Sequence, residues 1–245
     1  MDQTGASPID AALPRAAPRF SVCTLVNDHA QYRAMVASFC ARGFTPDDCE
    51  FLYLDNSDGT FWDAYRGIPR LVAMSRAPHV ILCHQDVRLI SDDADALAAR
   101  LGELDALDPA WALAGNAGGT DAGELAVRIS DPYGDDQRRG ELPARAVSLD
   151  ENFIVLKRDA PVGLSADLWG FHFYGADLCI LARLAGRSAW VIDFHLRHLS
   201  PGTKDAGFKA AQARFEAKYR ALFALPWRIR TTCARLRLKR GWLGR

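Results

Sequence analysis

The stretch from His79 to Leu89, HVILCHQDVRL, decides the predicted fold. Its apolar run from Val80 to Cys83 predicts a strand that is buried on both faces. Three polar residues, His84, Gln85 and Asp86, follow this strand directly. Open α/β sheets bind ligands at the carboxyl ends of their strands, so this position favours a binding site for metal or phosphate. The alternative is that Gln85 and Asp86 only form a turn and cap the next helix.

Two further strands are predicted before this stretch. The segment FSVCTLVN, residues 20–27, ends at Asn27, and EFLYL, residues 50–54, runs directly into Asp55 and Asn56. Each of these strands therefore also ends in polar side chains. Because parallel strands end at the same edge of a sheet, we expect these groups to meet there.

Helices are predicted between these strands. Apolar residues recur at helical spacing over residues 29–42 and 61–76, and Gly67 and Pro69 predict a break or kink in the second helix. A third helix is expected after Ser91 as its N-cap. This alternation is typical of an α/β domain with a mostly parallel central sheet flanked by helices.

The second half of the chain is less regular. Residues 116–145 are rich in Gly, Asp and Arg and are predicted to form a long functional loop. Further elements are expected at residues 111–115, 145–158 and 189–194 as strands, and at 177–184 and 205–223 as helices.

Composition bounds the class of protein. The 245 residues are 49% hydrophobic, which is enough for one large core or at most two small ones. Lys plus Arg and Asp plus Glu number 30 each, so overall charge gives no reason to expect nucleic acid as a partner. The six cysteines form no CxxC pair and indicate reduced packing residues in a cytoplasmic protein. No apolar run approaches the roughly 18 residues that cross a bilayer.

We expect three segments along the chain. Residues 1–18 lack the features of a secretory signal and are predicted to be a disordered leader, and residues 19–225 form the α/β domain. Residues 226–245 carry seven basic residues and no acidic one, interleaved with apolar residues. Such a basic amphipathic tail can lie on the inner face of the cell membrane. The alternative is a solvated helix or a frayed end.

Four segments together resemble a known family. They are LYLDNSDGT at 52–60, LCHQDV at 82–87, FYGADLCILARLAGR at 173–187 and HLSPGTKD at 198–205. Their order and spacing resemble the GT-A fold of glycosyltransferase family 2, in a divergent branch with HQDV in place of the DXD motif. The resemblance implies an enzyme that moves a sugar from a nucleotide-diphosphate donor to a hydroxyl acceptor, with inversion at the anomeric carbon, in polysaccharide or glycoconjugate synthesis.

The resemblance also implies a metal site. Asp86 matches the last aspartate of the DXD motif, which binds Mn²⁺ or Mg²⁺ between the two donor phosphates. His198 matches a histidine that completes the metal shell in some members, with His195 as the competing candidate. His84 stands where the motif begins with an acidic residue, so one ligand is either missing or replaced. The alternative is that cationic side chains meet the diphosphate, namely His198, Lys204, Arg138 and Arg139.

Other roles follow from the same resemblance. The donor nucleotide, with a UDP-sugar favoured, would contact Asn27, Asp55, Asn56, Gln85 and Lys204. Asp177 resembles the catalytic base that accepts the proton of the acceptor hydroxyl. The alternative is that Asp177 only caps its helix.

The acceptor side is expected at Asp150, Glu151, Trp169 and His172, where the aromatic residues either stack on a sugar or fill the core. The acceptor would be a glycan, a lipid-linked molecule or a protein. One competing hypothesis is a catalytically inactive partner protein that binds a sugar nucleotide. Another is a metal-dependent hydrolase or nucleotidyltransferase in which Asp86, His195 and His198 share one metal ion.

Overall fold

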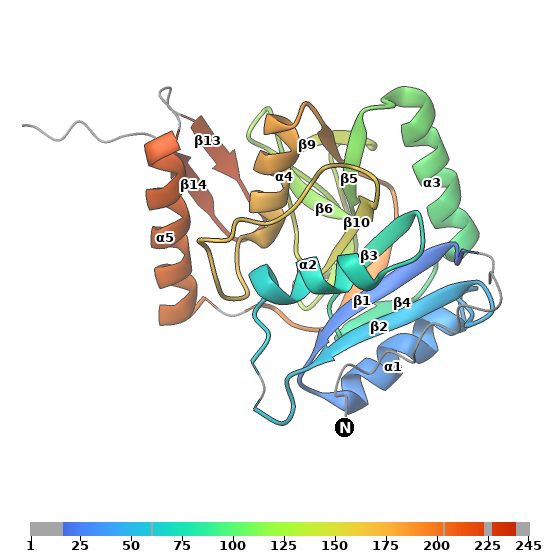
Figure 1. Cartoon of the computed structure of the whole chain (residues 1–245). Coiled ribbons are helices and arrows are strands. Elements are labelled where there is room, and N and C mark those ends of the chain that lie inside the picture. Colours follow the sequence, from blue (N-terminus) through green and yellow to red (C-terminus); the bar gives the residue numbers. More distant parts are fainter. Residues whose placement is uncertain (1–16, 60, 203, 223–226, 239–245) are drawn as a thin grey trace, which may run out of the picture.

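The computed structural model describes residues 17–59, 61–202, 204–222 and 227–238. In these residues, helices pack on a large curled sheet (Figure 1). The helices are α1 (His29–Cys40), α2 (Ala64–Met74), α3 (Ala94–Leu107), α4 (Tyr174–Leu184) and α5 (Ala206–Leu222).

The described part of the chain contains one 12-stranded sheet and a separate two-stranded one. The strands of the large sheet are β1 (Phe20–Val26), β2 (Cys49–Asp55), β3 (His79–Cys83), β4 (Val87–Leu89), β5 (Trp111–Gly115), β6 (Ala117–Thr120), β7 (Leu125–Asp131), β8 (Gly134–Arg139), β9 (Ala144–Leu149), β10 (Phe153–Lys157), β11 (Ser188–Val191) and β12 (Leu196–His198). Their order is β2-β1-β3-β10-β5-β11-β9-β6-β7-β12-β4, and β8 pairs with β7.

The expectation of a mostly parallel sheet is wrong. Among the described residues of the large sheet, the parallel pairs are β1 with β2, β1 with β3, β5 with β11, and β7 with β12. The other neighbouring strands are antiparallel. One reason is that β10 lies antiparallel between β3 and β5. The α/β alternation therefore describes only the β1–β3 part of the sheet.

The second reason lies in residues 116–145, which form strands and not the expected loop. They contain β6, β7 and β8 and the start of β9. The sequences of β6 (AGGT) and β8 (GDDQRR) have no alternation of apolar and polar residues. Their strand structure comes from hydrogen bonding to β7 and β9, which local sequence does not reveal.

The helices differ from expectation only in detail. Pro69 lies inside α2 and does not break it. Asp93, and not Ser91, is the N-cap of α3, and its carboxylate accepts a hydrogen bond from Ala96 N. A carboxylate in this position satisfies a free amide of the first turn and interacts favourably with the helix dipole.

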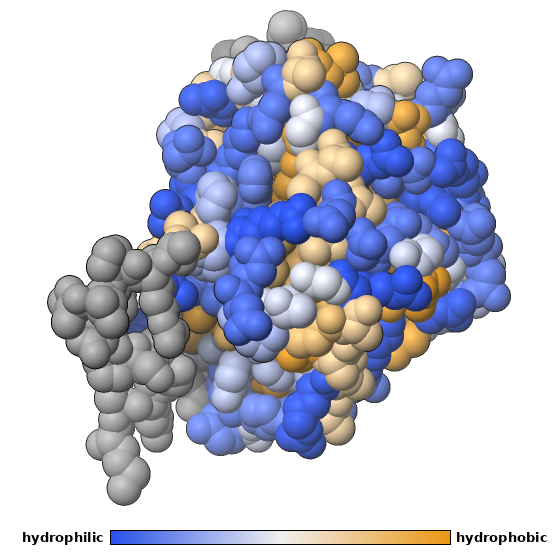
Figure 2. Space-filling view, turned by 90° about the vertical axis from the view of Figure 1, so that its right-hand side faces the viewer, coloured by the Kyte–Doolittle hydropathy of each residue, from blue (hydrophilic) through white to orange (hydrophobic). Residues whose placement is uncertain are grey.

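Two hydrophobic clusters fill the protein. The first includes Leu71 of α2, Ile180 of α4 and Phe215 of α5. The second includes Phe39 of α1 and Leu97 of α3. Figure 2 views the molecule from the right-hand side of Figure 1, where α1 and α3 lie, and shows mainly hydrophilic residues with narrow groups of apolar ones between them. These helices therefore turn their apolar sides inward.

The described part of the predicted tail is a hairpin that packs on the domain. Its strands are β13 (Trp227–Arg230) and β14 (Arg235–Leu238). Ile229 and Leu236 are buried in the first hydrophobic cluster. A Cβ on Gly119 would lie 1.7 Å from Arg230 O, so only glycine allows β6 and the hairpin to approach this closely.

Some expectations lie outside the described residues. These are the leader over residues 1–16 and the end of the tail, residues 239–245. None of the described helices has the length and apolar character needed to span a bilayer.

Candidate functional site

Strand pairing brings the polar ends of two distant strands together. The turn His84–Gln85–Asp86 connects β3 to β4, and His84 N donates a hydrogen bond of 3.0 Å to Asn152 O. Strand β12 pairs antiparallel with β4, and His198 lies opposite Val87. Asp86 and His198 are therefore neighbours in space.

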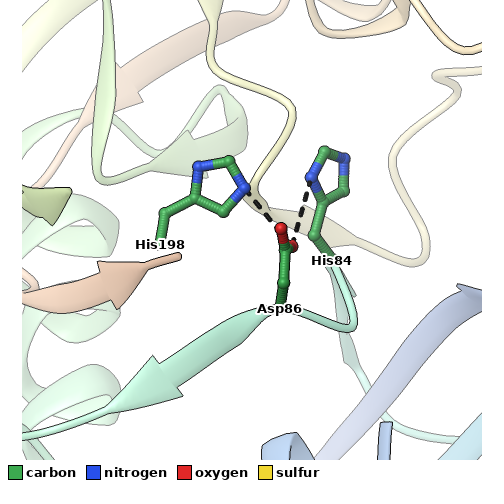
Figure 3. A group of neighbouring side chains, drawn as sticks. All are labelled: His84, Asp86 and His198. Atoms are coloured by element: carbon green, nitrogen blue, oxygen red, sulfur yellow. Dashed lines mark ion pairs between the residues drawn. The ribbon is translucent and has the colours of Figure 1, made fainter. Parts of the chain in front are cut away.

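His84, Asp86 and His198 form a cluster of possible metal ligands (Figure 3). Their ligand atoms all lie within 4.8 Å of one another. His198 Nε2 lies 3.3 Å from Asp86 Oδ1, and His84 Nδ1 lies 4.0 Å from the same oxygen. The three side chains come from the ends of β3 and β12 and offer two imidazole nitrogens and a carboxylate.

A second hydrogen bond orients His84. Tyr174 Oη donates to Glu151 O at 2.8 Å, so it accepts the 3.1 Å hydrogen bond from His84 Nε2. With the proton on Nε2, His84 Nδ1 keeps the lone pair that a metal ligand needs, and this atom faces Asp86.

Two groups of the cluster, His84 and Asp86, are in the ionisation state that a metal ligand needs, whereas the contact with Asp86 favours protonated His198, whose proton a metal ion would displace. Burial, together with the positive charge of His198, lowers the pKa of His84 to about 4, so this imidazole is neutral at pH 7. Burial raises the pKa of Asp86, but the contact with His198 outweighs burial and holds that pKa below its usual value. His198 has a raised pKa, because the contact with Asp86 outweighs burial. Apart from this ion pair, the buried Nε2 of His198 has no hydrogen-bond partner among the described residues.

The cluster lies in the wall of a cavity of about 710 Å³. This volume is within the range of roughly 300–1,000 Å³ that is usual for small-molecule sites. Nine of the predicted site residues line it: Asn27, Asn56, Gln85, Asp86, Asp150, Glu151, His172, His198 and Lys204. Gln85 Oε1 accepts hydrogen bonds of 3.0 Å from Asn27 N and Asp28 N, which ties the end of β1 to the turn after β3.

Asp177 does not line this cavity. Its carboxylate is buried in the first turn of α4 and accepts hydrogen bonds from Ser165 N at 2.8 Å, Ser165 Oγ at 2.7 Å and Tyr219 Oη. Burial raises its pKa. Asp177 is thus not brought together with Asp86 in this structure, because its carboxylate joins a loop and α5 to α4. It does not cap α4, whose N-cap is Phe173.

Two other predicted residues also lie outside the cavity lining. Asp55 is paired with His29 at 2.8 Å, and hydrogen bonds from Ser57 lower its pKa. Trp169 is half exposed, and the guanidinium of Arg214 lies 4.2 Å from its ring centroid.

The structure separates the two candidate histidines. His195 is buried, and its ring contacts Ser91 Oγ at 3.0 Å and Ser130 Oγ at 2.9 Å, so it does not join the cluster of Asp86 and His198. The loop arginines are also outside the cavity lining, and Arg138 pairs with Asp193 at 2.6 Å.

Sequence reasoning missed several residues of the cavity. Asp131 and Tyr133 come from the β7–β8 hairpin, which was expected to be a loop. Thr232 and Cys233 come from the turn of the C-terminal hairpin, and Thr232 Oγ1 donates to Asp150 Oδ2. No local signal in the sequence indicates that either hairpin reaches the cavity, since both contacts depend on which strands pair.

Glu151 is a further titratable group of this cavity with a shifted pKa. Burial, together with the negative charge of Asp150, raises its pKa to about 8. Gly175 N lies 3.4 Å from Glu151 Oε1 as a weak donor. A carboxyl group with a pKa close to neutrality can accept or donate a proton under ordinary conditions.

Comparison with known proteins gives one relative in sequence. The chain is 40% identical over 230 residues to "ATP synthase subunits region ORF 6" of Fuscovulum blasticum. The aligned region covers 91% of this chain and 92% of that protein. No family model matches the sequence.

Similarity to solved structures concerns the fold. A mannosyltransferase from Pyrobaculum calidifontis, determined in complex with GDP-Man and Mn²⁺, matches 84% of this chain with a TM-score of 0.51 and 13% identity. The chain spans 62% of that mannosyltransferase. A197 from STIV matches 74% of this chain with a TM-score of 0.43 and 13% identity. The mannosyltransferase likeness shows a GT-A-like fold.

Proposed function

The chain belongs to the family of the Fuscovulum blasticum ORF 6 protein, whose name states no activity. We propose that the chain is a glycosyltransferase that uses a nucleotide-diphosphate sugar. The observation that carries this proposal is the convergence of His84, Asp86 and His198 in the wall of one cavity. The GT-A-like fold adds support, since a structural neighbour of this fold binds GDP-Man and Mn²⁺.

Charge in the cavity supports a metal-assisted site for the donor. The lining contains the carboxylates of Asp86, Asp131 and Asp150, the carboxyl group of Glu151, which is mostly protonated at neutral pH, and a single lysine, Lys204. A diphosphate would be repelled by such a lining unless a cation accompanied it. Held by His84, Asp86 and His198, a divalent metal would neutralise charge on the diphosphate leaving group.

The chemistry of the three metal-ligand side chains suggests which metal is preferred. Mg²⁺ favours oxygen ligands, whereas imidazole nitrogens suit transition metals. Because His84 and His198 provide two imidazoles and Asp86 one carboxylate, we propose that Mn²⁺ binds in preference to Mg²⁺.

The nucleotide and the acceptor would occupy different parts of the cavity. Asn27 and Asn56 follow β1 and β2 at the carboxyl edge of the parallel strands, where α/β sheets bind nucleotides. Asp150, Glu151 and His172 also line the cavity and would face the acceptor. The sugar transferred and the acceptor class are open.

Glu151 is the better candidate for the base in this structure. Direct displacement at the anomeric carbon needs a carboxylate that accepts the proton of the attacking hydroxyl. Glu151 lines the cavity, whereas the carboxylate of Asp177 is enclosed by Ser165 and Tyr219. We therefore move the proposed catalytic role from Asp177 to Glu151, with inversion as the outcome.

The enclosed position of Asp177 also favours the second candidate, a partner protein that binds a sugar nucleotide without turnover. A panel of nucleotide sugars with Mn²⁺, assayed for both binding and hydrolysis or transfer, separates the two. The enzyme hypothesis expects turnover that Glu151→Gln abolishes, while binding persists. Binding without turnover of any donor would support the partner protein.

Asp86→Asn tests the site itself. This change should weaken donor binding, and Asp121→Asn is the matched control because Asp121 is exposed and paired with Arg183 away from the cavity. Failure of every donor to bind the unmodified protein would end both candidates.

A further inference from the structure

The C-terminal hairpin separates its side chains onto two faces. Ile229 and Leu236 lie directly opposite each other and are 1% and 0% exposed. Because side chains alternate along a strand, the arginines on either side of them point to the opposite face. We call this the arginine face. Arg228, Arg235 and Arg237 are exposed on it, and Arg230 is partly buried, with its Nε enclosed.

The register of the hairpin places like charges across from each other. Arg228 lies opposite Arg237, and Arg230 lies opposite Arg235. Like charges in such cross-strand pairs destabilise a sheet unless an anion lies between them. None of the four makes an ion pair with a carboxylate in the described part of the chain.

The neighbouring helix shows a different pattern. On α5, Lys218 pairs with Asp167, and Arg220 pairs with Glu216. The chain thus neutralises two of the four basic residues of α5, whereas all four arginines of the hairpin lack a carboxylate partner among the described residues. This contrast points to an anionic partner outside the chain for the arginine face.

The sequence that follows the hairpin indicates which partner. Residues 239–245, KRGWLGR, continue directly from β14 and add cations together with Trp242 and Leu243. Basic residues interleaved with tryptophan and leucine are typical of segments that bind the interface of an anionic bilayer. We propose that the arginine face docks on an anionic membrane surface.

This surface adjoins the cavity. The turn between β13 and β14 carries Thr232 and Cys233, which line the cavity. A bilayer against the arginine face would therefore lie beside the cavity, where an acceptor anchored in the membrane can reach it. Membrane docking needs no sugar donor, so the proposal holds or fails apart from glycosyl transfer.

Co-sedimentation of the full chain with vesicles tests the proposal. The variant is Arg228→Gln/Arg237→Gln, and the matched control is Arg33→Gln/Arg139→Gln, which removes the same charge from exposed positions elsewhere. Vesicles of phosphatidylcholine with phosphatidylglycerol are compared with pure phosphatidylcholine. Each arginine at an anionic surface contributes about fivefold to the partition coefficient, so we expect a roughly 30-fold loss for the variant and little change for the control.

Other readouts make the outcome decisive. Arg228→Lys/Arg237→Lys keeps the charge and should keep binding, and circular dichroism checks that each variant is folded. Binding to anionic vesicles should fall as salt is raised. Equal binding by the double glutamine variant and its control would overturn the proposal. So would the absence of vesicle binding, or tighter binding to single-stranded RNA than to the vesicles.

Discussion

His198 Nε2 lies 3.3 Å from Asp86 Oδ1, which joins the end of β12 to the turn after β3. The contact depends on the antiparallel pairing of β12 with β4. It places a carboxylate and an imidazole in the wall of the cavity, where His84 completes a possible metal site. The proposed chemistry depends on this contact.

Restoring an acidic residue at position 84 should change metal preference. We expect His84→Asp to raise the affinity for Mg²⁺ relative to Mn²⁺ by about tenfold, because an oxygen ligand replaces an imidazole. Titration calorimetry with each metal measures the ratio. His172→Gln is the control, since His172 lines the same cavity outside the ligand cluster. An unchanged ratio in His84→Asp would show that His84 is not a ligand.

Glu151 should give the activity a pH dependence. Its pKa of about 8 means that the proposed base is mostly protonated at neutral pH, so kcat/KM should rise as pH increases through 8. A flat profile between pH 6 and 9 would argue against this role. Glu151→Gln should remove the rise together with the turnover.

The same group affects stability with a definite sign. Its folded-state pKa is raised above the unfolded value of about 4.3, so ionisation in the fold is unfavourable and stability falls as pH rises from that value through 8. The Glu151→Gln variant has no carboxyl group to ionise at this position, so it lacks this free-energy cost. Chemical denaturation at pH 5 and pH 9 should show the variant gaining stability relative to the unmodified protein at the higher pH.

Asp177 is expected to act on stability. Asp177→Asn replaces an acceptor by an amide that faces the donors Ser165 and Tyr219, and we expect a loss of about 1–3 kcal/mol in the free energy of unfolding. Asp167→Asn is the control, since its exposed pair with Lys218 contributes about 0–1 kcal/mol. Urea unfolding measures both. Loss of turnover without loss of stability in Asp177→Asn would return the catalytic role to Asp177.

Thr232 is expected to position Asp150. Thr232→Val removes the hydroxyl that donates to Asp150 Oδ2 and should lower kcat/KM about tenfold or more, because a hydrogen bond to a charged group is lost. Thr232→Ser should restore activity, and Thr120→Val serves as a control outside the cavity lining. If Thr232→Ser remains as inactive as the valine variant, the hydroxyl is not responsible.

Two glycines should respond in opposite directions to alanine. In Gly119→Ala, the new Cβ meets Arg230 O and forces the hairpin away from β6, at a cost of about 1–3 kcal/mol. In Gly102→Ala, nothing lies within 4 Å and the helix α3 gains about 0.5–1 kcal/mol. Thermal unfolding compares them. Equal effects would mean that the hairpin is not packed as described.

The sequence predicts well those parts of the fold that depend on local pattern. The apolar run at β3 and the helical spacing of α1 agree with the structure. The cavity residues Asp86 and Gln85 follow from their position after β3. In these cases, burial on both faces or on one stripe leaves a direct signal in the residue types.

The remaining features depend on pairing between distant strands. Strand β8 has a polar sequence and exists because it pairs with β7, and Thr232 reaches Asp150 only because the hairpin packs over Gly119. Asp177 resembled a base by its place at the start of α4, but its partners Ser165 and Tyr219 come from other segments. Such tertiary contacts leave no periodic pattern in the sequence.

The most direct test of the proposed site is anomalous scattering at the manganese edge from crystals grown with Mn²⁺ and a nucleoside diphosphate. We predict one strong peak about 2 Å from His84 Nδ1, a carboxylate oxygen of Asp86 and His198 Nε2, with the diphosphate in contact with the same ion. A bound nucleotide with no manganese at these three side chains, or manganese bound elsewhere, would contradict the account.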